Sequence, residues 1–176
     1  MTYLPAASTA LTGQQTQTVV MTDTSTRVDI AGAAVQNVDF TGLSGETDGD
    51  YELEYYIVGV TGTSNLTLQP ENDTANAITK GMHATATMGV TNSATTLLLE
   101  IISPGINFYG TATLRSKSGQ GNRYFKATAY ETDNEAFFMQ GYWTANTVIT
   151  KVRVNASAGS HIGIGSWFVL RKLGKL

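Results

Sequence analysis

Hydrophobic and polar residues alternate along most of this chain with a period of two, the spacing that is typical of β-strands. The clearest case is the segment 51–60, where Tyr51, Leu53, Tyr55 and Ile57 share one face and glutamates occupy the other. No part of the pattern requires a helix, so the sequence predicts an all-β fold of about ten strands. The segments expected to form them are residues 26–31, 35–41, 51–60, 65–69, 95–102, 108–117, 122–131, 136–142, 147–155 and 166–172.

Each strand is expected to have one buried side and one solvent-facing side. Near the C-terminus, Val148 and Val152 fall on the face opposite Ile149 and Lys151, and this one-sided pattern is typical of antiparallel sheets. The turn residues agree, because the glycine-containing segment 118–122 separates two of these strands as a hairpin loop would. The sequence therefore predicts an antiparallel two-sheet sandwich.

Two regions depart from this pattern. Residues 1–24 are rich in Ala, Thr and Gln, with only the short apolar cluster 19–21, and are expected to form an extended N-terminal arm. Residues 25–176 are then the β-sandwich domain, which has the length of one ordinary domain. Within it, residues 70–93 are expected to be a long loop, or a loop with a poor edge strand.

Composition narrows the range of partners. Charged residues make up 14% of the chain and the formal net charge is -3, so no basic surface for nucleic acid is expected. A polar but weakly charged surface is typical of proteins that pack against copies of themselves or against neighbours. There is no cysteine, which leaves no disulfide and no thiolate metal site.

The start of the chain bears on its localisation. The first residues, MTYLPAAS, lack the basic and apolar regions of a signal peptide. No stretch has the length of a transmembrane segment. The expectation is a protein that is made in a cytoplasm without classical export and that has no membrane partner.

Candidate catalytic or metal-binding residues are few. The two histidines, His83 and His161, have no carboxylate or second ligand at metal spacing nearby, so both are interpreted as loop residues. Glu46, Asp48 and Asp50 surround a glycine and could gather oxygen ligands for Ca²⁺, although a solvated turn before the strand is favoured. The sequence predicts no catalytic residue, no cofactor and no metal ligand, with an ion at this acidic turn left open.

Aromatic residues are the remaining candidates for a binding site. Most are expected in the core, since a sandwich needs rings between its sheets. The alternative is a sugar-binding platform of exposed rings such as Tyr142 and Trp143, or a site in the 70–93 loop. The aromatic residues concerned are Tyr51, Tyr55, Tyr56, Phe108, Tyr109, Tyr124, Phe125, Tyr130, Phe137, Phe138, Tyr142 and Trp143.

Several distinct short segments follow one another in a definite order along the chain. They are FTGLSG at 40–45, DYEL at 50–53, LTLQPEND at 66–73, GYW at 141–143, ITKVRV at 149–154 and GSHIGIGSWFVLR at 159–171. Together these segments resemble a β-sandwich module that is found in structural proteins of tailed-bacteriophage virions. The resemblance covers roughly residues 35–172.

This resemblance implies a jelly-roll-like sandwich with a structural role in the virion, without catalytic residues and without enzyme activity. The expected function is that of a capsid decoration (cement) protein, which binds and stabilises the assembled phage capsid. Its expected partners are further copies of the chain, as a trimer, and the major capsid protein or neighbouring virion proteins. The alternative is a tail or fibre component that acts as a receptor- or glycan-binding module.

Overall fold

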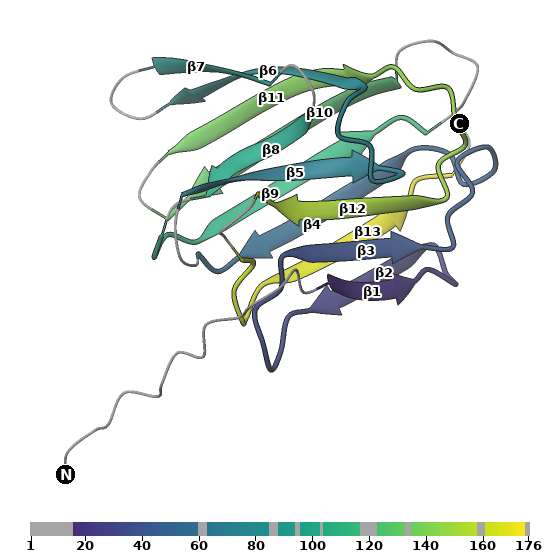
Figure 1. Cartoon of the computed structure of the whole chain (residues 1–176), viewed down its shortest axis with the longest axis horizontal. Coiled ribbons are helices and arrows are strands. Elements are labelled where there is room, and N and C mark those ends of the chain that lie inside the picture. Colours follow the sequence, from purple (N-terminus) through teal and green to yellow (C-terminus); the bar gives the residue numbers. More distant parts are fainter. Residues whose placement is uncertain are drawn as a thin grey trace.

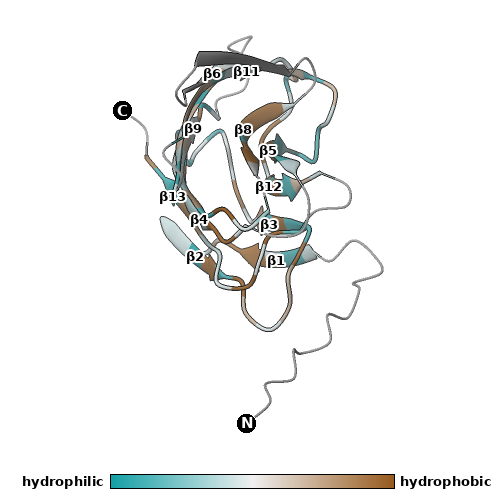
Figure 2. Cartoon of the chain, turned by 90° about the vertical axis from the view of Figure 1, so that its left-hand side faces the viewer, coloured by the Kyte–Doolittle hydropathy of each residue, from teal (hydrophilic) through white to brown (hydrophobic). Residues whose placement is uncertain are grey.

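The computed structural model describes residues 16–59, 63–84, 88–93, 96–102, 104–116, 123–132, 135–157 and 161–174. Within these residues the chain forms thirteen strands and no helix, arranged as two facing sheets (Figure 1). The larger sheet curves around the smaller one (Figure 2). The predicted all-β sandwich of two sheets is confirmed.

The two sheets differ in size. The smaller sheet contains, in spatial order, β1 (Thr16–Val20), β3 (Asn37–Thr41), β12 (Lys151–Ala156), β5 (Ser64–Pro70) and β8 (Leu97–Ile102). The larger sheet contains, in spatial order, β2 (Ser25–Asp29), β13 (Trp167–Lys172), β4 (Tyr51–Ile57), β9 (Phe108–Leu114), β10 (Arg123–Glu131), β11 (Ala136–Trp143), β6 (Ala77–Ala84) and β7 (Met88–Ser93). Among these strands, β1 and β3 pair in parallel and the other neighbours pair antiparallel.

Eight of these strands follow the order of a jelly roll. They form two four-stranded groups, β2-β13-β4-β9 in the larger sheet and β3-β12-β5-β8 in the smaller one. When the eight are renumbered by sequence, the orders read 1-8-3-6 and 2-7-4-5, which is the arrangement of two Greek keys in a jelly roll. We name these eight strands the jelly-roll frame.

The other five strands are additions to the frame. β1 lies at the edge of the smaller sheet beside β3. The hairpin β6–β7 is inserted between β5 and β8 in the sequence, and the hairpin β10–β11 is inserted between β9 and β12. These two inserted hairpins meet where β11 pairs with β6, and they extend the larger sheet beyond the frame (Figure 1).

The core lies between the sheets and is built from alternate residues of the strands. In β4, Tyr51, Leu53, Tyr55 and Ile57 are each at most 1% exposed, as their period-two spacing predicts, and the glutamates between them face outwards. Burial of a large apolar side chain of this kind contributes about 1.5–3 kcal/mol. The inner face of each sheet is therefore the main source of stability.

All ten predicted strands are present, and three observed strands lie outside the predicted segments. β1 falls in the interval 1–24, where mostly polar residues favoured an extended arm; it pairs with β3, and Met21 directly after it is buried. β6 and β7 fall in the interval 70–93, where Gly81 and scattered polar residues obscure the alternation. The prediction that Val148 faces inwards is wrong, because β12 begins only at Lys151 and Val148 is 41% exposed.

The C-terminal end of β13 is fastened to the turn before β4. Gly49 has φ of 80° and forms an isolated parallel bridge with Gly174. A Cβ atom at Gly49 would overlap the Gly174 carbonyl oxygen, so this position requires glycine both for its φ and for space. The Lys172 ammonium lies 3.2 Å from the Asp48 carboxylate at the same place. This part of the basic C-terminus thus belongs to the fold.

Candidate functional site

Large apolar side chains are concentrated on the outer face of the larger sheet. Nine such side chains are exposed in the described part of the chain, and five of them lie on this face: Met82, Tyr109, Tyr124, Tyr130 and Phe138. They alternate along β6, β9, β10 and β11 with residues that face the core, so the pleat of the sheet places them on one side. A cluster of exposed apolar side chains marks an interaction surface.

A row of aromatic rings crosses this face from strand to strand. Cross-strand pairing places Tyr56 between Trp167 and Tyr109. Tyr130 is the next residue in the row, opposite Tyr109. The Tyr56 and Trp167 rings stack with centroids 6.3 Å apart, and the Tyr130 ring meets Phe138 edge to face at 6.5 Å. We name these five residues the aromatic strip; it crosses five strands, or about 19 Å at the usual strand spacing.

The charged groups beside the aromatic strip are paired with one another. The Arg27 guanidinium lies 4.6 Å from the centre of the Trp167 ring and contacts a neighbouring aspartate at 2.7 Å. Arg171 donates a hydrogen bond to the Glu54 carboxylate at 2.6 Å, and the Tyr109 hydroxyl donates another at 2.8 Å. These hydrogen bonds, that of Arg171 first, hold the pKa of Glu54 below its usual value. The charges on this part of the face are therefore engaged within the chain.

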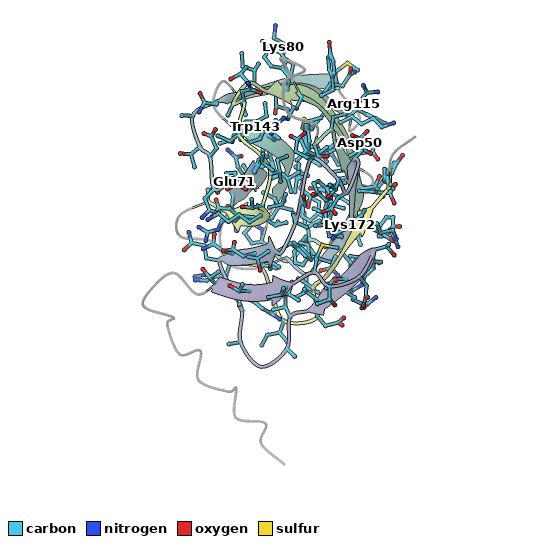
Figure 3. All side chains as sticks on the ribbon, turned by 90° about the vertical axis from the view of Figure 1, so that its right-hand side faces the viewer. Asp50, Glu71, Lys80, Arg115, Trp143 and Lys172 are labelled. Carbon is cyan, nitrogen blue, oxygen red and sulfur yellow. The ribbon has the colours of Figure 1, made fainter. Side chains whose placement is uncertain are left out.

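A groove opens on the same face at the inserted hairpins. It has a volume of about 750 Å³ and is lined by β6, β10 and β11. Three rows of outward-facing residues cross these strands, and the middle row contains two lysines: Lys80 lines the groove itself, and Lys126 lines the hollow beside it. An apolar residue stands on either side of the middle row in each of β6 and β11. We name this site the lysine groove; Lys80 there points away from the body of the molecule (Figure 3). The outward-facing rows are Tyr124–Tyr142–Ile78, Lys126–Gln140–Lys80 and Thr128–Phe138–Met82.

The lysine groove carries more positive than negative charge. Among the described residues, neither Lys80 nor Lys126 has a carboxylate within salt-bridge distance. A smaller hollow of about 400 Å³ shares Tyr124 and Gln140 with the groove. It is lined by Lys126 and adds Arg115 and Asp50, which lie 3.8 Å apart. Three cations therefore face one carboxylate across the two hollows, in a chain whose net charge is -3.

The acidic turn before β4 does not direct its carboxylates to one point. The Asp48 carboxylate accepts hydrogen bonds from the Ser44 amide at 2.7 Å and the Tyr51 hydroxyl at 2.9 Å. Burial opposes the charged form, but these bonds and the Lys172 ammonium outweigh it and hold the pKa of Asp48 below its usual value. The Asp50 carboxylate instead faces the Arg115 guanidinium in the smaller hollow. In the described residues, no three histidine, aspartate or glutamate side chains converge as metal ligands would.

Trp143 is a core residue, and the prediction that it belongs to an exposed platform is wrong. It is 1% exposed, and its indole N–H donates to the Asp73 carboxylate at 2.7 Å. The Arg123 guanidinium lies 4.7 Å from the ring centre. Burial lowers the pKa of Arg123, while the charge of Glu46 acts in the opposite sense. Tyr142, on the opposite face of the same strand, lines the lysine groove.

The turn at residues 71–73, part of one segment that carried the resemblance, holds the fold together. Glu71 and Asn72 have φ of 53° and 57°, in the left-handed region that forms a tight turn after β5. The Glu71 carboxylate accepts hydrogen bonds from the amides of Thr150 at 2.5 Å and Lys151 at 2.9 Å. These residues therefore join β5 to the start of β12.

Three other titratable residues complete the list of candidates. His161 is half-buried beside the bridge between Val35 and Ile162. The prediction that His83 is a loop residue is wrong, because it lies in β6; its side chain is outside the described residues. Glu100, on β8, is fully buried, and its carboxyl oxygens have no hydrogen-bond partner among the described residues. Burial raises the pKa of Glu100 well above its usual value, and so favours the protonated form.

Comparison with known proteins adds no relative, since no family model and no curated protein matches the chain. Within the described residues, no helix has the length and apolar character needed to cross a membrane. The function must therefore be inferred from the outer face of the larger sheet.

The sequence does not by itself identify the aromatic strip or the lysine groove. One signal is present, because Tyr124, Lys126 and Tyr130 occupy alternate outward positions of the predicted strand 122–131. Their neighbours Phe138 and Gln140 follow only from the register of β10 against β11. That register depends on the length of the connecting turn, which alternation alone does not give.

Proposed function

We propose that this chain is a non-catalytic structural protein of a tailed-phage virion, and that it serves there as a capsid decoration protein. The ordered segments that resemble virion modules support this proposal, and so does the jelly-roll order, which is the fold that the resemblance implies. In this role the protein binds the assembled capsid. A protein that binds only the assembled shell stabilises it by mass action.

The aromatic strip is the observation that carries the proposal. The core is complete on the inner side of the sheet, so the fold does not need rings on the outer side. Tyr109 and Tyr130 nevertheless remain 43% and 52% exposed. Aromatic side chains on a flat surface are typical anchors of protein interfaces. The proposed partner at the strip is the major capsid protein, with copies of the chain associated as a trimer.

The N-terminal segment is proposed as a second point of attachment. β1 lies at the edge of the smaller sheet, so its free edge can accept another strand. Deletion of residues 1–15 would leave β1 and the buried Met21 in place. Deletion of residues 1–24 would remove both and uncover the core. The shorter deletion therefore tests the residues before β1 alone. We expect capsid binding to weaken while the sandwich stays folded, and the contact that remains to be made by the edge of β1.

Location in the particle tests the proposal directly. The chain would be labelled in intact virions and its position and copy number determined by electron microscopy. We expect many copies spread over the whole shell. A few copies at a single vertex would contradict the decoration role and would favour a tail or fibre component.

A paired substitution tests the strip itself. We expect Tyr109→Ser together with Tyr130→Ser to abolish binding to shells that lack the chain, as measured by co-sedimentation. Val148→Ser is the matched control, because Val148 is also exposed but is not on this face. Equal loss of binding in the control, or full binding by the double variant, would show that the strip is not the attachment surface.

The second candidate is the receptor- or glycan-binding role of a tail or fibre module. The lysine groove favours it, because exposed rings beside polar side chains are the composition of a sugar-binding site.

A further inference from the structure

We propose that the lysine groove binds acidic oligosaccharides, whose carboxylate or sulfate groups pair with Lys80 and Lys126 while their sugar rings rest on the adjacent tyrosines. The inference goes beyond the decoration role and does not depend on it. Its stacking residues, Tyr124 and Tyr142, are not part of the aromatic strip, and Phe138 is the one residue that borders both sites.

The rings of the groove are placed to stack on sugars. Tyr124 is 65% exposed, and Tyr142 is its direct cross-strand neighbour. Side chains in such a pair have Cβ atoms about 5 Å apart, so the two rings form one platform. Phe138 stands on the other side of the lysine row, on the same strand as Tyr142. A sugar chain that crosses the groove therefore meets apolar surface on both sides of the charged row.

Charge complementarity selects an acidic ligand. Lys80 and Lys126 flank Gln140 in one row, so their backbones are two strand spacings apart, or about 10 Å. Their long side chains can converge on one anionic group held above Gln140, whose amide can bond to sugar hydroxyls. Arg115 supplies a third cation in the adjoining hollow. Arg115 already has Asp50 beside it, but a neutral sugar would leave the two lysines without counter-charges.

The groove is not suited to an extended peptide. Such peptides usually bind by adding a strand to an open sheet edge, where backbone N–H and C=O groups are free. Here β11 is paired with β10 on one side and with β6 on the other. β10 and β6 are in turn paired with β9 and β7. The floor of the groove therefore offers side chains only, which is how proteins commonly recognise sugars.

The surrounding charges also disfavour single-stranded nucleic acid, which would use rings and lysines too. Glu52 lies in the same cross-strand row as Lys126, two strands away on the frame. Glu54 lies in the neighbouring row, and because both glutamates share the single cation Arg171, the group keeps a net negative charge. A phosphate backbone that continued past the groove in this direction would meet these carboxylates, whereas an oligosaccharide with isolated acidic groups can end before them.

The first test is direct binding by the full chain. A printed array would carry sialylated, uronate and sulfated oligosaccharides, each beside its neutral counterpart, together with oligothymidylate. We expect at least one acidic saccharide to bind more strongly than its neutral counterpart and more strongly than the oligothymidylate. Failure of every acidic saccharide to exceed its counterpart, or stronger binding of the oligothymidylate, would overturn the inference.

The second test locates the site by titration calorimetry with the best acidic saccharide and its neutral counterpart. We expect Lys80→Gln together with Lys126→Gln to weaken the acidic ligand by about tenfold or more and to leave the neutral one unchanged. Tyr124→Ala should weaken both. Lys151→Gln is the control for loss of a lysine elsewhere: it removes one positive charge from the smaller sheet, against two in the double variant.

The outcomes separate this inference from the decoration role. Acidic-ligand binding that is equal in wild type and the double lysine variant would overturn the inference, whatever the array shows. The same variant should bind shells normally, because it leaves the aromatic strip intact. Loss of shell binding by the strip variant with retained saccharide binding would support both assignments, and loss of saccharide binding alone by the lysine variant would support the groove.

Discussion

The outer faces of the two sheets differ in whether their polar and apolar side chains have partners within the chain. On the smaller sheet, polar side chains bond to each other across strands: Asn155 donates to Asn37 at 2.7 Å, and Gln69 donates to Asn155 at 3.4 Å. Arg153 and Asp39 form a pair beside them at 2.6 Å. On the larger sheet, the aromatic strip and the two groove lysines leave apolar area and positive charge without a partner in the described chain. A face whose groups satisfy each other needs nothing further, so the larger sheet is the side on which we propose that partners bind.

The larger sheet shows the same contrast within itself. On the frame, Arg171 and Glu54 neutralise each other. On the inserted hairpins, Lys80 and Lys126 have no such neighbour among the described residues. The frame thus supplies the fold, and the hairpins supply the chemistry that distinguishes this surface.

The largest expected effect separates the inner and outer rings of one strand. Trp143→Ala should lower the free energy of unfolding by roughly 3–5 kcal/mol, because it leaves a cavity and strips partners from Arg123 and Asp73. Tyr142→Ala, one residue away on the outer face, should cost less than about 1 kcal/mol. Urea unfolding of both variants measures the difference. Equal losses would mean that the outer rings also hold the fold, and the comparison of the two faces would fail.

Glu100 is an ionisable side chain that is fully buried in the core, on the inner side of the smaller sheet. Because burial raises its pKa, the folded protein holds this proton more tightly than the unfolded chain, whose glutamates titrate near pH 4.3. The free energy of unfolding should therefore fall as the pH rises above that value, by up to about 1.4 kcal/mol per pH unit, until the folded-state pKa is reached.

The variant Glu100→Gln isolates this effect, since it has nearly the same shape and cannot ionise. We expect it to match the wild type near pH 4 and to be more stable at pH 7, as judged by urea midpoints across the pH range. The lowered pKa values of Asp48 and Glu54 act in the opposite direction, but they are common to both proteins and cancel in the difference. Parallel pH profiles would show that the Glu100 charge is accommodated in the folded state.

A smaller effect is expected from the polar network of the smaller sheet. Asp39→Asn should cost roughly 1–3 kcal/mol, because Arg153 loses a bidentate partner with side-chain exposures of only 22% and 11% in the pair. Thermal unfolding at low and high salt measures it. Arg27→Met, which breaks a pair more than half exposed, is the control and should cost less. A reversal of this order would contradict the view that the smaller sheet satisfies itself.

The smallest expected effect belongs to the lysine groove. Lys80→Gln with Lys126→Gln should change the free energy of unfolding by less than about 0.5 kcal/mol, because neither lysine bonds to a carboxylate in the described structure. Urea unfolding provides the measurement. A large loss of stability would show that these lysines stabilise the fold, and it would count against a binding role for them.

The alternation of apolar and polar residues predicts the jelly-roll frame well, because a strand with one buried face has an apolar residue at every second position. Tyr51, Leu53, Tyr55 and Ile57 all face the core as their spacing requires. The pattern fails where a strand lies at a sheet edge or in an insertion. β1, the edge strand of the smaller sheet, is half-exposed on one face and exposed on the other, so its sequence shows little alternation between apolar and polar residues.

The candidate site is harder to predict than the fold for a different reason. Exposed rings and buried rings look alike in sequence: Phe137 is 2% exposed and Phe138, the next residue, is 42% exposed. Which of them faces outwards depends on the register of one strand, and which residues surround it depends on pairing between segments that are far apart. β6 and β11 meet across more than fifty residues of sequence, so no local pattern could place Lys80 beside Gln140.

The placement of the two inserted hairpins has a consequence for how such proteins diversify. Each hairpin interrupts the chain between two frame strands and leaves the order of the frame strands unchanged. A change of length or sequence in β6–β7 or β10–β11 would therefore alter the proposed binding surface without altering the topology that must be found during folding. Because the two hairpins pair with each other, they would have to be exchanged together to replace that surface on the same frame.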